Sequence, residues 1–529
     1  MIMKISYKTK SVIINRILLI IANFLLIATL CYVVFINSLS VKPLSDFYVD
    51  EIEFNSIKSS RYNSVYPLVK EISFNNFQLF EDEMSGNWFY SIVEDDKDAY
   101  NPLVKISSYH GKIKYAALKY DFSEYSISHN IPIKFIAYNN TSYYTFDVIC
   151  TTLPIVNLTK EDINIFDNRA GVKKRFFRST SNYKIKGNAS RWFSKKTFKL
   201  RLHIFSPGNN PRKISKSILG MPSGSNWELY AGYNDPLRIR NVFSAKLWSD
   251  CCSHNNVFDI NNSFEYKYIE LFLNNKYHGL YAIGYPLNRY LADIKNNEYL
   301  LKKETWYYYI LKAGPKNENF VLGSNPIIKD FYETIKGKNK KDNKEIYNAV
   351  DIGNSIDMWL FVNFIQGEDQ TKDYLLNNHY LIIKKYMNRY KMIYTPWDMD
   401  QTWGFGFNSI MKNTTDENAY KYSDNIIMKS SAVYTLLQNK DPKIKNLIKS
   451  RYSYLRKTSW SYEHITNMLD NYENEIYNSG AYQRDIIRWK NSNQLTDPNV
   501  KLSEFKKYIK KRINVMDAYV DSITSEKKD

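Results

Sequence analysis

A run of about twenty mostly apolar residues near the N-terminus constrains the organisation of this chain more than any other feature. It covers residues 17–36, with Asn23 and Thr29 as its polar residues. At about 1.5 Å of rise per residue, a helix of this length spans the hydrocarbon core of a bilayer. Four basic residues precede the run and only Lys42 follows it closely, so the N-terminus is expected in the cytoplasm.

We therefore predict a basic cytoplasmic segment at residues 1–16 and an uncleaved signal-anchor at 17–37. The remaining chain would then lie outside the cytoplasm, as a single-pass membrane protein. A cleaved signal peptide is the alternative. The apolar run exceeds the usual signal length, however, and no A-x-A-like site follows it.

Residues 46–152 contain short strand-like runs at intervals of about ten residues, separated by turn residues such as Asn-Asn and His-Gly. This spacing predicts an all-β, sandwich-like extracytoplasmic domain that acts as a spacer or binds a ligand. Residues 153–522 mix strands with helices, and 523–529 form a tail. The helices are expected at 237–249, 356–365, 432–437, 441–458, 462–477, 481–490 and 502–522. The predicted class is α+β, with a helical C-terminal lobe.

The segment TPWDMDQTWG, residues 395–404, carries two carboxylates one residue apart, Asp398 and Asp400. They follow an apolar run, 390–394, that is typical of a strand. Alternate strand residues face the same side, so the two carboxylates are expected to share a small space. A hard divalent cation that clamps nucleotide phosphates would offset their repulsion. A surface turn with two solvated aspartates is the alternative, but the apolar and aromatic neighbours favour a site.

The residues upstream strengthen this prediction. Residues 357–365 form a segment that we interpret as amphipathic, followed by a polar loop and then by the strand-like NNHYLIIKK. In phosphoryl-transfer sites a loop Asp positions the acceptor hydroxyl, while an Asn and a further Asp hold the metal. Asp373 and Asn378 have the matching spacing. Asp369 is a rival for the loop position, although its distance to Asn378 fits less well.

Several blocks, taken in order, resemble the spore-coat-protein-H (CotH) kinase family, a set of atypical, secreted or membrane-linked protein kinases. The blocks are LPIVNL from residue 153, KGNASRWFSKKTFKLRL (186–202), NWELYAGYNDPLRIRN (226–241), YIELFLNNKYHGLY (268–281), DYLLNNHYL (373–381) and PWDMDQTWG (396–404). Together they span roughly residues 153–522, about seventy per cent of the chain. Their order and spacing carry the resemblance, because no single block is decisive.

The resemblance implies a kinase-like domain at 153–522 that uses ATP with Mg²⁺ or Mn²⁺. It assigns catalysis to Asp373 and metal binding to Asn378, Asp398 and Asp400. The acceptor would be a Ser or Thr of a protein at the cell surface, in the envelope or in the spore coat.

Without a G-x-G-x-x-G motif, the phosphate contacts must come mainly from side chains. The candidates are Arg191, Lys195, Lys196, Lys302 and Lys303. Arg240, followed by Asn241, matches a family pattern, but it could equally buttress the start of a helix.

One departure leaves a second hypothesis open. After the Gly-Leu-Tyr at 279–281 the family usually has a glutamate, where this chain has Tyr285. If that glutamate orients a nucleotide-binding lysine, its loss favours a pseudokinase that assembles a surface layer or spore coat. A metal-dependent glycosyltransferase is a third hypothesis, although no nucleotide-sugar Rossmann pattern is present. The net charge of +19 is dispersed, and no nucleic-acid-binding motif accompanies it.

Overall fold

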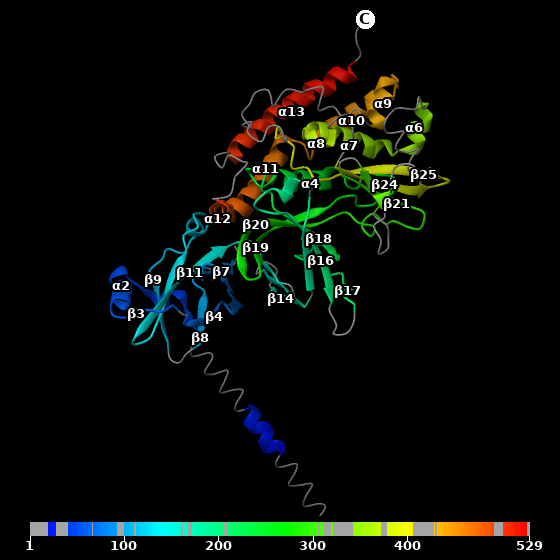
Figure 1. Cartoon of the computed structure of the whole chain (residues 1–529). Coiled ribbons are helices and arrows are strands. Elements are labelled where there is room, and N and C mark those ends of the chain that lie inside the picture. The colour runs from blue at the N-terminus through cyan, green and yellow to red at the C-terminus, as the bar shows by residue number, and fades with distance from the viewer. Residues whose placement is uncertain are drawn as a thin grey trace, which may run out of the picture. The chain divides into compact units, whose positions relative to one another are not determined.

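The computed structural model (Figure 1) describes residues 19–27, 41–65, 67–92, 100–109, 113–159, 162–167, 172–178, 180–187, 189–204, 210–304, 307–310, 319–320, 342–371, 378–405, 428, 431–490 and 501–525. The chain divides into two compact units, with the main boundary between Thr151 and Thr152. The first unit also holds Asn168–Lys174, and the second also holds Ser128–Asn130.

Residues 19–27 of the predicted anchor are helical and exposed, and the rest of that run lies outside the described residues. Within the described ranges, no helix combines the length and the apolar character needed to cross a membrane.

The N-terminal unit contains two sheets. One has the strand order β1-β8-β4-β5, and the other has the order β2-β9-β10-β11-β7-β6, with β3 pairing β11. Their elements are β1 (Lys42–Pro43), η1 (Leu44–Phe47), β2 (Tyr48–Val49), α2 (Glu51–Ser59), β3 (Tyr62–Asn63), β4 (Val69–Phe74), β5 (Phe77–Gln78), β6 (Phe80–Glu81), β7 (Trp88–Ser91), β8 (Leu103–Ser108), β9 (Lys114–Leu118), α3 (Glu124–Ser128), β10 (Ile133–Tyr138) and β11 (Ser142–Thr151).

The two sheets share one core, because Phe74 of the first sheet packs with Phe135 of the second. The α2 helix covers the other face of the larger sheet through Phe54 and Ile57. The all-β prediction is therefore wrong, because the described part of this unit also contains the helices α2 and α3. Within the larger sheet, β11 pairs with β7 and β3 in parallel. Asp50 accounts for the first helix, since its side chain accepts a hydrogen bond from Glu53 N and caps α2.

The C-terminal unit begins with a nine-stranded sheet of order β14-β13-β12-β19-β20-β18-β16-β15, with β17 pairing β16. The strands are β12 (Ile155–Leu158), β13 (Asp162–Asp167), β14 (Val172–Arg178), β15 (Thr180–Ile185), β16 (Phe198–Ile204), β17 (Arg212–Lys213), β18 (Asn226–Tyr230), β19 (Glu265–Leu273) and β20 (Lys276–Tyr285). A short η3 turn (Ala189–Arg191) connects β15 to β16, and α4 (Arg240–Cys251) lies between β18 and β19 in the chain.

A five-stranded sheet of order β23-β22-β21-β24-β25 follows, together with the helices that Figure 1 shows above it. Its strands are β21 (Tyr299–Glu304), β22 (Tyr307–Ile310), β23 (Asn319–Phe320), β24 (His379–Tyr386) and β25 (Arg389–Pro396). The helices are α6 (Asn343–Ala349), α7 (Ile352–Phe364), α8 (Glu368–Thr371), α9 (Ala432–Gln438), α10 (Ile444–Lys457), α11 (Tyr462–Tyr472) with η8 (Glu473–Tyr477), α12 (Ala481–Arg488) and α13 (Leu502–Thr524).

The β19–β20 hairpin separates two cores. Tyr268 and Leu280 face the larger core, which the helices share, whereas Ile269 and Tyr281 face a second core within the nine-stranded sheet. The α7 helix runs through the larger core and is buried from Asn354 to its end. The interpretation of this segment as amphipathic is therefore wrong, since a helix surrounded by protein has no solvated face.

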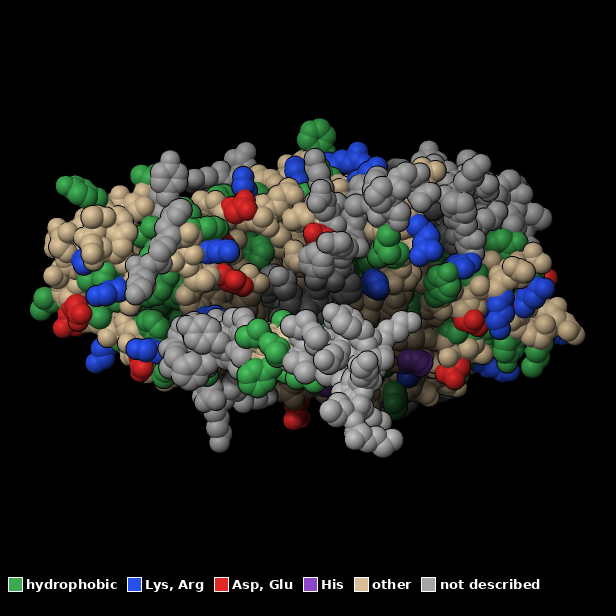
Figure 2. All heavy atoms as spheres, turned by 90° about the horizontal axis from the view of Figure 1, so that it is seen from below, with side chains coloured by type: hydrophobic (Ala, Val, Ile, Leu, Met, Phe, Trp, Pro, Cys, Tyr) green, Lys and Arg blue, Asp and Glu red, His purple; other side chains and the backbone are tan. Residues whose placement is uncertain are grey.

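The mixed α+β class is confirmed, and the seven helices expected from the sequence are present with ends shifted by a few residues. On the face drawn in Figure 2, basic and acidic side chains are interspersed rather than gathered by sign.

Candidate active site

The two predicted metal aspartates lie in a turn just after β25. The strand ends at Pro396, and Asp398 then adopts a φ of 55°, a left-handed conformation that breaks the strand geometry. Met399 is buried, and its N–H donates to Asn241 Oδ1 at 2.9 Å. The aspartates therefore follow the strand instead of forming its end, which corrects the predicted geometry. A strained, well-anchored backbone of this kind is characteristic of functional turns.

A lysine–glutamate ion pair faces this turn. Lys186 follows β15, and its Nζ lies 2.6 Å from Glu228 Oε1 in β18. The Nζ of Lys186 is 4.7 Å from the centre of the Trp397 ring, and that of Lys302 is 4.6 Å from the same centre. Two ammonium groups therefore lie against the Trp397 indole next to Asp398, one from the residue after β15 and one from β21.

The glutamate is held by its neighbours across the sheet. Glu228 and Tyr266 both lie opposite Gly284, and the Tyr266 hydroxyl donates to Glu228 Oε2 at 3.3 Å. A Cβ atom at Gly284 would lie 2.2 Å from the Tyr266 ring, so the absence of a side chain there makes room for this contact.

The environment of Asp398 raises the pKa of its carboxyl to about 6. Burial is the largest cause, and the nearby carboxylates of Glu228 and Asp369 act in the same direction. The ammonium groups of Lys186 and Lys302 oppose this shift without cancelling it.

Asp400 is affected in the same direction. Burial and the Asp398 carboxylate raise the pKa of Asp400 well above its ordinary value, with further contributions from Asp369 and Asp235. A hydrogen bond from Asn234 Nδ2 to Asp400 Oδ2, at 2.7 Å, opposes the shift. The negative charge of Asp398 therefore makes the ionisation of Asp400 less favourable.

We refer to the carboxylates around this turn as the acidic cluster, which comprises Asp235, Glu228, Asp369, Asp398 and Asp400. Cations that interact with this cluster include Lys186, Lys302 and Arg240, and Arg238 also lies in the field of Asp235. The pKa values of Asp398 and Asp400 are nevertheless raised. A divalent cation would favour their ionised forms, and carboxylate oxygens are the donors that Mg²⁺ and Mn²⁺ prefer.

The predicted metal ligands could provide part of the coordination shell of such an ion. No group of three or more His, Cys, Asp or Glu side chains with metal-site spacing occurs in the described part of the chain. Magnesium usually takes only one or two protein carboxylates and completes its shell with water and substrate phosphates. The site therefore suits a metal that arrives with a nucleotide better than a permanently bound ion.

Asn378 is brought beside the turn by backbone pairing. Its carbonyl accepts a hydrogen bond from Trp397 N at 2.9 Å, and its side-chain amide donates to Asp369 Oδ2. Gln370 of α8 donates to the carbonyls of Trp397 and Asp398, both at 3.1 Å. The α8 loop and the aspartate turn are thus bonded to each other. Asp373 and the side chain of Lys303 lie outside the described residues.

Lys195 does not take part in the site, although the sequence suggested a phosphate contact. It is fully buried, and its Nζ donates to Ala231 O (2.8 Å) and Leu280 O (2.6 Å) and pairs with Asp485 Oδ1 (2.8 Å). These three contacts use all three donors of an ammonium group. The prediction for Lys195 is wrong because the side chain connects the nine-stranded sheet to α12.

Arg240 has the second of the two roles that the sequence left open. It is buried at the first residue of α4 and forms an ion pair with Asp235. The Asp235 carboxylate also accepts the N–H groups of Leu237, Ile239 and Arg240, which stabilises the start of the helix. This also explains why α4 begins three residues later than predicted.

Arg191 and Lys196 lie in the connection between β15 and β16. Arg191 is exposed, and Lys196 Nζ donates to its carbonyl oxygen at 2.7 Å. Neither residue has an interaction with the acidic cluster in the described structure. Of the predicted cations that the structure describes, only Lys302 lies against the aspartate turn.

Several residues of the site had no role in the sequence analysis, among them Lys186, Glu228, Asn234 and Asp235. These four fall inside the blocks at 186–202 and 226–241. The sequence did hold one signal for them, because Glu228 is a charged residue between apolar residues in a strand. A charged side chain is buried in such a strand only when it is paired, so Glu228 indicated a cationic partner.

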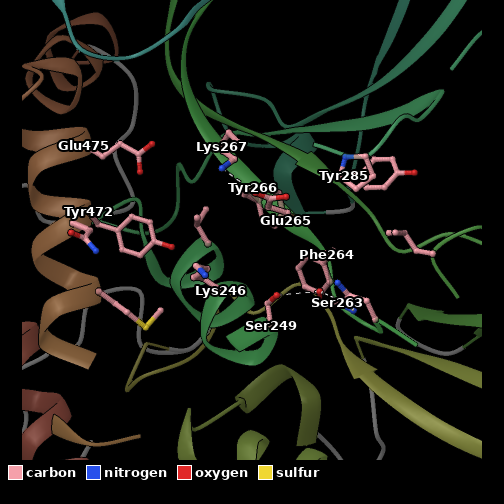
Figure 3. Close-up of a pocket in the computed structure, with 16 residues that line it drawn as sticks. Lys246, Ser249, Ser263, Phe264, Glu265, Tyr266, Lys267, Tyr285, Tyr472 and Glu475 are labelled. Atoms are coloured by element: carbon pink, nitrogen blue, oxygen red, sulfur yellow. Dashed lines mark hydrogen bonds and ion pairs between the residues drawn. The ribbon is translucent and has the colours of Figure 1, made fainter. Parts of the chain in front are cut away.

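A hollow of about 380 Å³ lies beside the site, bounded by β19, α4 and α11 (Figure 3). Phe264 and Tyr266 line it, but no member of the acidic cluster does. Tyr285 also lines this hollow, and its hydroxyl donates to Ser223 O at 3.0 Å. The carboxylate that pairs with Lys186 comes from Glu228, so this pair does not need a glutamate at position 285.

The Lys186–Glu228 pair of the nine-stranded sheet thus faces Asn378, just before β24, and Asp398 and Asp400, just after β25 of the five-stranded sheet. The family model of the CotH kinase protein matches residues 183–516, well over half of the chain. The chain therefore belongs to the CotH kinase family. No match is found among curated proteins.

Proposed function

We propose that the protein transfers the γ-phosphoryl group of ATP to a Ser or Thr hydroxyl of a protein substrate, with Mg²⁺ or Mn²⁺ as its metal. The observation that carries the proposal is the convergence of Asp398, Asp400 and Asn378 at one turn, which the Lys186–Glu228 pair and Lys302 face. Burial raises the pKa of both aspartates there, so an added positive charge would favour their ionised forms. Membership of a kinase family supports the same reaction class.

In this proposal Asp398, Asp400 and Asn378 hold the metal, and Asp373 positions the acceptor hydroxyl. ATP would supply the phosphoryl group, and its metal ion would supply the positive charge that offsets the carboxylates of the cluster. Lys186, fixed by Glu228, and Lys302 contribute positive charge beside the phosphates. Transfer then depends on positioning and electrostatic stabilisation more than on covalent catalysis.

The test is incubation of the full chain with γ-labelled ATP, Mg²⁺ or Mn²⁺ and dephosphorylated casein as a general Ser/Thr acceptor. We expect metal-dependent labelling of casein or of the protein itself, and its loss in Asp398→Asn. The matched control is Asp470→Asn, because Asp470 is about half exposed and pairs only with a surface lysine. If the wild type neither binds Mg²⁺–ATP nor releases ADP, the pseudokinase alternative replaces the kinase proposal.

We also propose that residues 17–37 anchor the protein in a membrane and that both folded units lie outside the cytoplasm. The apolar run and its basic N-terminal flank support this topology. The substrate would then be a protein of the cell surface, the envelope or the spore coat. Protease added to intact cells should digest the folded units, and full protection would reverse the topology.

A further inference from the structure

Tyr230, the last residue of β18, is a buried tyrosine whose hydroxyl has no hydrogen-bond partner among the described residues. The residue is 6% exposed, so water does not readily satisfy the hydroxyl. Buried polar groups are nearly always bonded, and an exception inside a candidate active site calls for an explanation such as a catalytic or ligand-binding role.

The position of this hydroxyl is fixed by the strand. Alternate residues of a strand face one side, so Tyr230 points to the same side as Glu228, two residues earlier. The following residue, Ala231, accepts a hydrogen bond from Lys195 Nζ, and its N–H donates to Thr197 Oγ1 at 3.1 Å. The buried lysine thus holds the backbone that carries the tyrosine.

The hydroxyl lies in the field of three carboxylates but bonds to none of them. After burial, the groups that raise the pKa of Tyr230 are Asp400, Asp235 and Asp398. Asp400 accepts from Asn234, and Asp235 is occupied by Arg240 and the start of α4. The hydroxyl therefore stays protonated and remains an unused hydrogen-bond donor beside Asp398 and Asp400.

We propose that the Tyr230 hydroxyl donates a hydrogen bond to a phosphate oxygen of the nucleotide. The proposal rests on the proposed function, because it needs phosphate bound beside Asp398 and Asp400. It adds a substrate-contacting residue that comes from β18 rather than from the aspartate turn or the α8 loop.

Tyr230→Phe in the full chain tests the proposal. A hydrogen bond to a charged acceptor is worth roughly a ten- to hundredfold change in affinity, so calorimetry should show Mg²⁺–ATP and Mg²⁺–ADP binding weakened by about that factor. Affinity for adenosine, which has no phosphate, should stay unchanged. The melting temperature without ligand should stay the same or rise, because the substitution removes a buried group without a partner.

Tyr268→Phe is the matched control. Tyr268 and Tyr230 both lie opposite Ala282, but the Tyr268 hydroxyl donates to Arg238 O at 2.7 Å. This variant should melt earlier than the wild type and keep its affinity for Mg²⁺–ATP.

The outcomes separate the two proposals. Suppose that the wild type binds Mg²⁺–ATP. If Tyr230→Phe binds Mg²⁺–ATP equally well, or loses as much affinity for adenosine as for Mg²⁺–ATP, the role of Tyr230 is overturned while the kinase proposal stands. If Tyr230→Phe melts earlier without ligand, the hydroxyl has a protein partner and the role is likewise overturned. If the wild type binds no Mg²⁺–ATP, both proposals fall.

Discussion

Two buried groups of charges in the C-terminal unit differ in how completely they are paired. In the first, Asp485 accepts from Lys195, Arg238 and Leu280 N. Other donors of the two cations, Lys195 Nζ and Arg238 Nη1, bond to backbone carbonyls such as Ala231 O and Gly232 O. In the second, the acidic cluster, the pKa values of Asp398 and Asp400 are raised despite the nearby cations.

The difference indicates what each group is for. A buried carboxylate that is bonded to two cations and a backbone N–H, as Asp485 is, needs no ligand, and its bonds connect α12 to the nine-stranded sheet. A cluster in which the pKa of two carboxyls is raised disfavours their ionised forms until a cation arrives, which is the expected state of a metal–nucleotide site without its ligand. Complete pairing therefore indicates a structural role, and incomplete pairing a binding role.

The largest effect should come from breaking the complete network. Asp485→Asn leaves two buried cations without a counter-charge, so the free energy of unfolding should fall by about 3–5 kcal/mol. Urea denaturation of the full chain measures it, with the exposed-pair variant Asp470→Asn as a control that loses at most about 1 kcal/mol. A loss below about 1 kcal/mol for Asp485→Asn would show that the network is not structural.

The next effect concerns activity. Asp373→Asn should lower phosphoryl transfer by at least about a hundredfold, the scale of a group that positions the acceptor. Its stability should change by no more than about 0.5 kcal/mol. Labelled-ATP transfer and thermal unfolding measure the two quantities. If Asp369→Asn abolishes transfer and Asp373→Asn does not, Asp369 is the loop aspartate, and its bond to Asn378 explains why.

A smaller effect of opposite sign is expected in the acidic cluster. Asp400→Asn removes one of two repelling carboxylates, so the ligand-free protein should gain on the order of 1 kcal/mol. The same variant should lose the stabilisation that Mg²⁺–ATP gives to the wild type. Calorimetry with and without Mg²⁺–ATP measures both quantities. If the ligand-free variant loses about 3 kcal/mol or more, Asp400 belongs to a structural ion pair.

The smallest effect is a dependence of stability on pH. The pKa of Asp398 is about 6 in the folded protein and near 3.8 in the unfolded chain, so between these values the folded state binds more protons. The free energy of unfolding should therefore fall as the pH rises through this window, in the absence of ligand. Asp398→Asn should flatten the profile, and an unchanged slope would mean that other groups cause it.

The sequence predicted the helices well because their apolar spacing is local, as in α10 and α13. It could not predict which lysines meet the aspartates. Lys195 and Lys186 lie nine residues apart in one basic block, but the first is buried against Asp485 and the second pairs with Glu228. Likewise, Asn234 reaches Asp400 across 166 residues of sequence, and no local pattern encodes that contact.

The most direct test of the account is the thermal unfolding of the full chain with Mg²⁺ alone, with ATP and EDTA, and with Mg²⁺ and ATP together. We predict that the midpoint rises only when both are present, by an amount equivalent to about 2.7 kcal/mol when the ligand is at a hundred times its Kd. A midpoint that does not change, or that rises equally with ATP and EDTA, would contradict the claim that the negative charge of the acidic cluster is offset by the metal of a bound nucleotide.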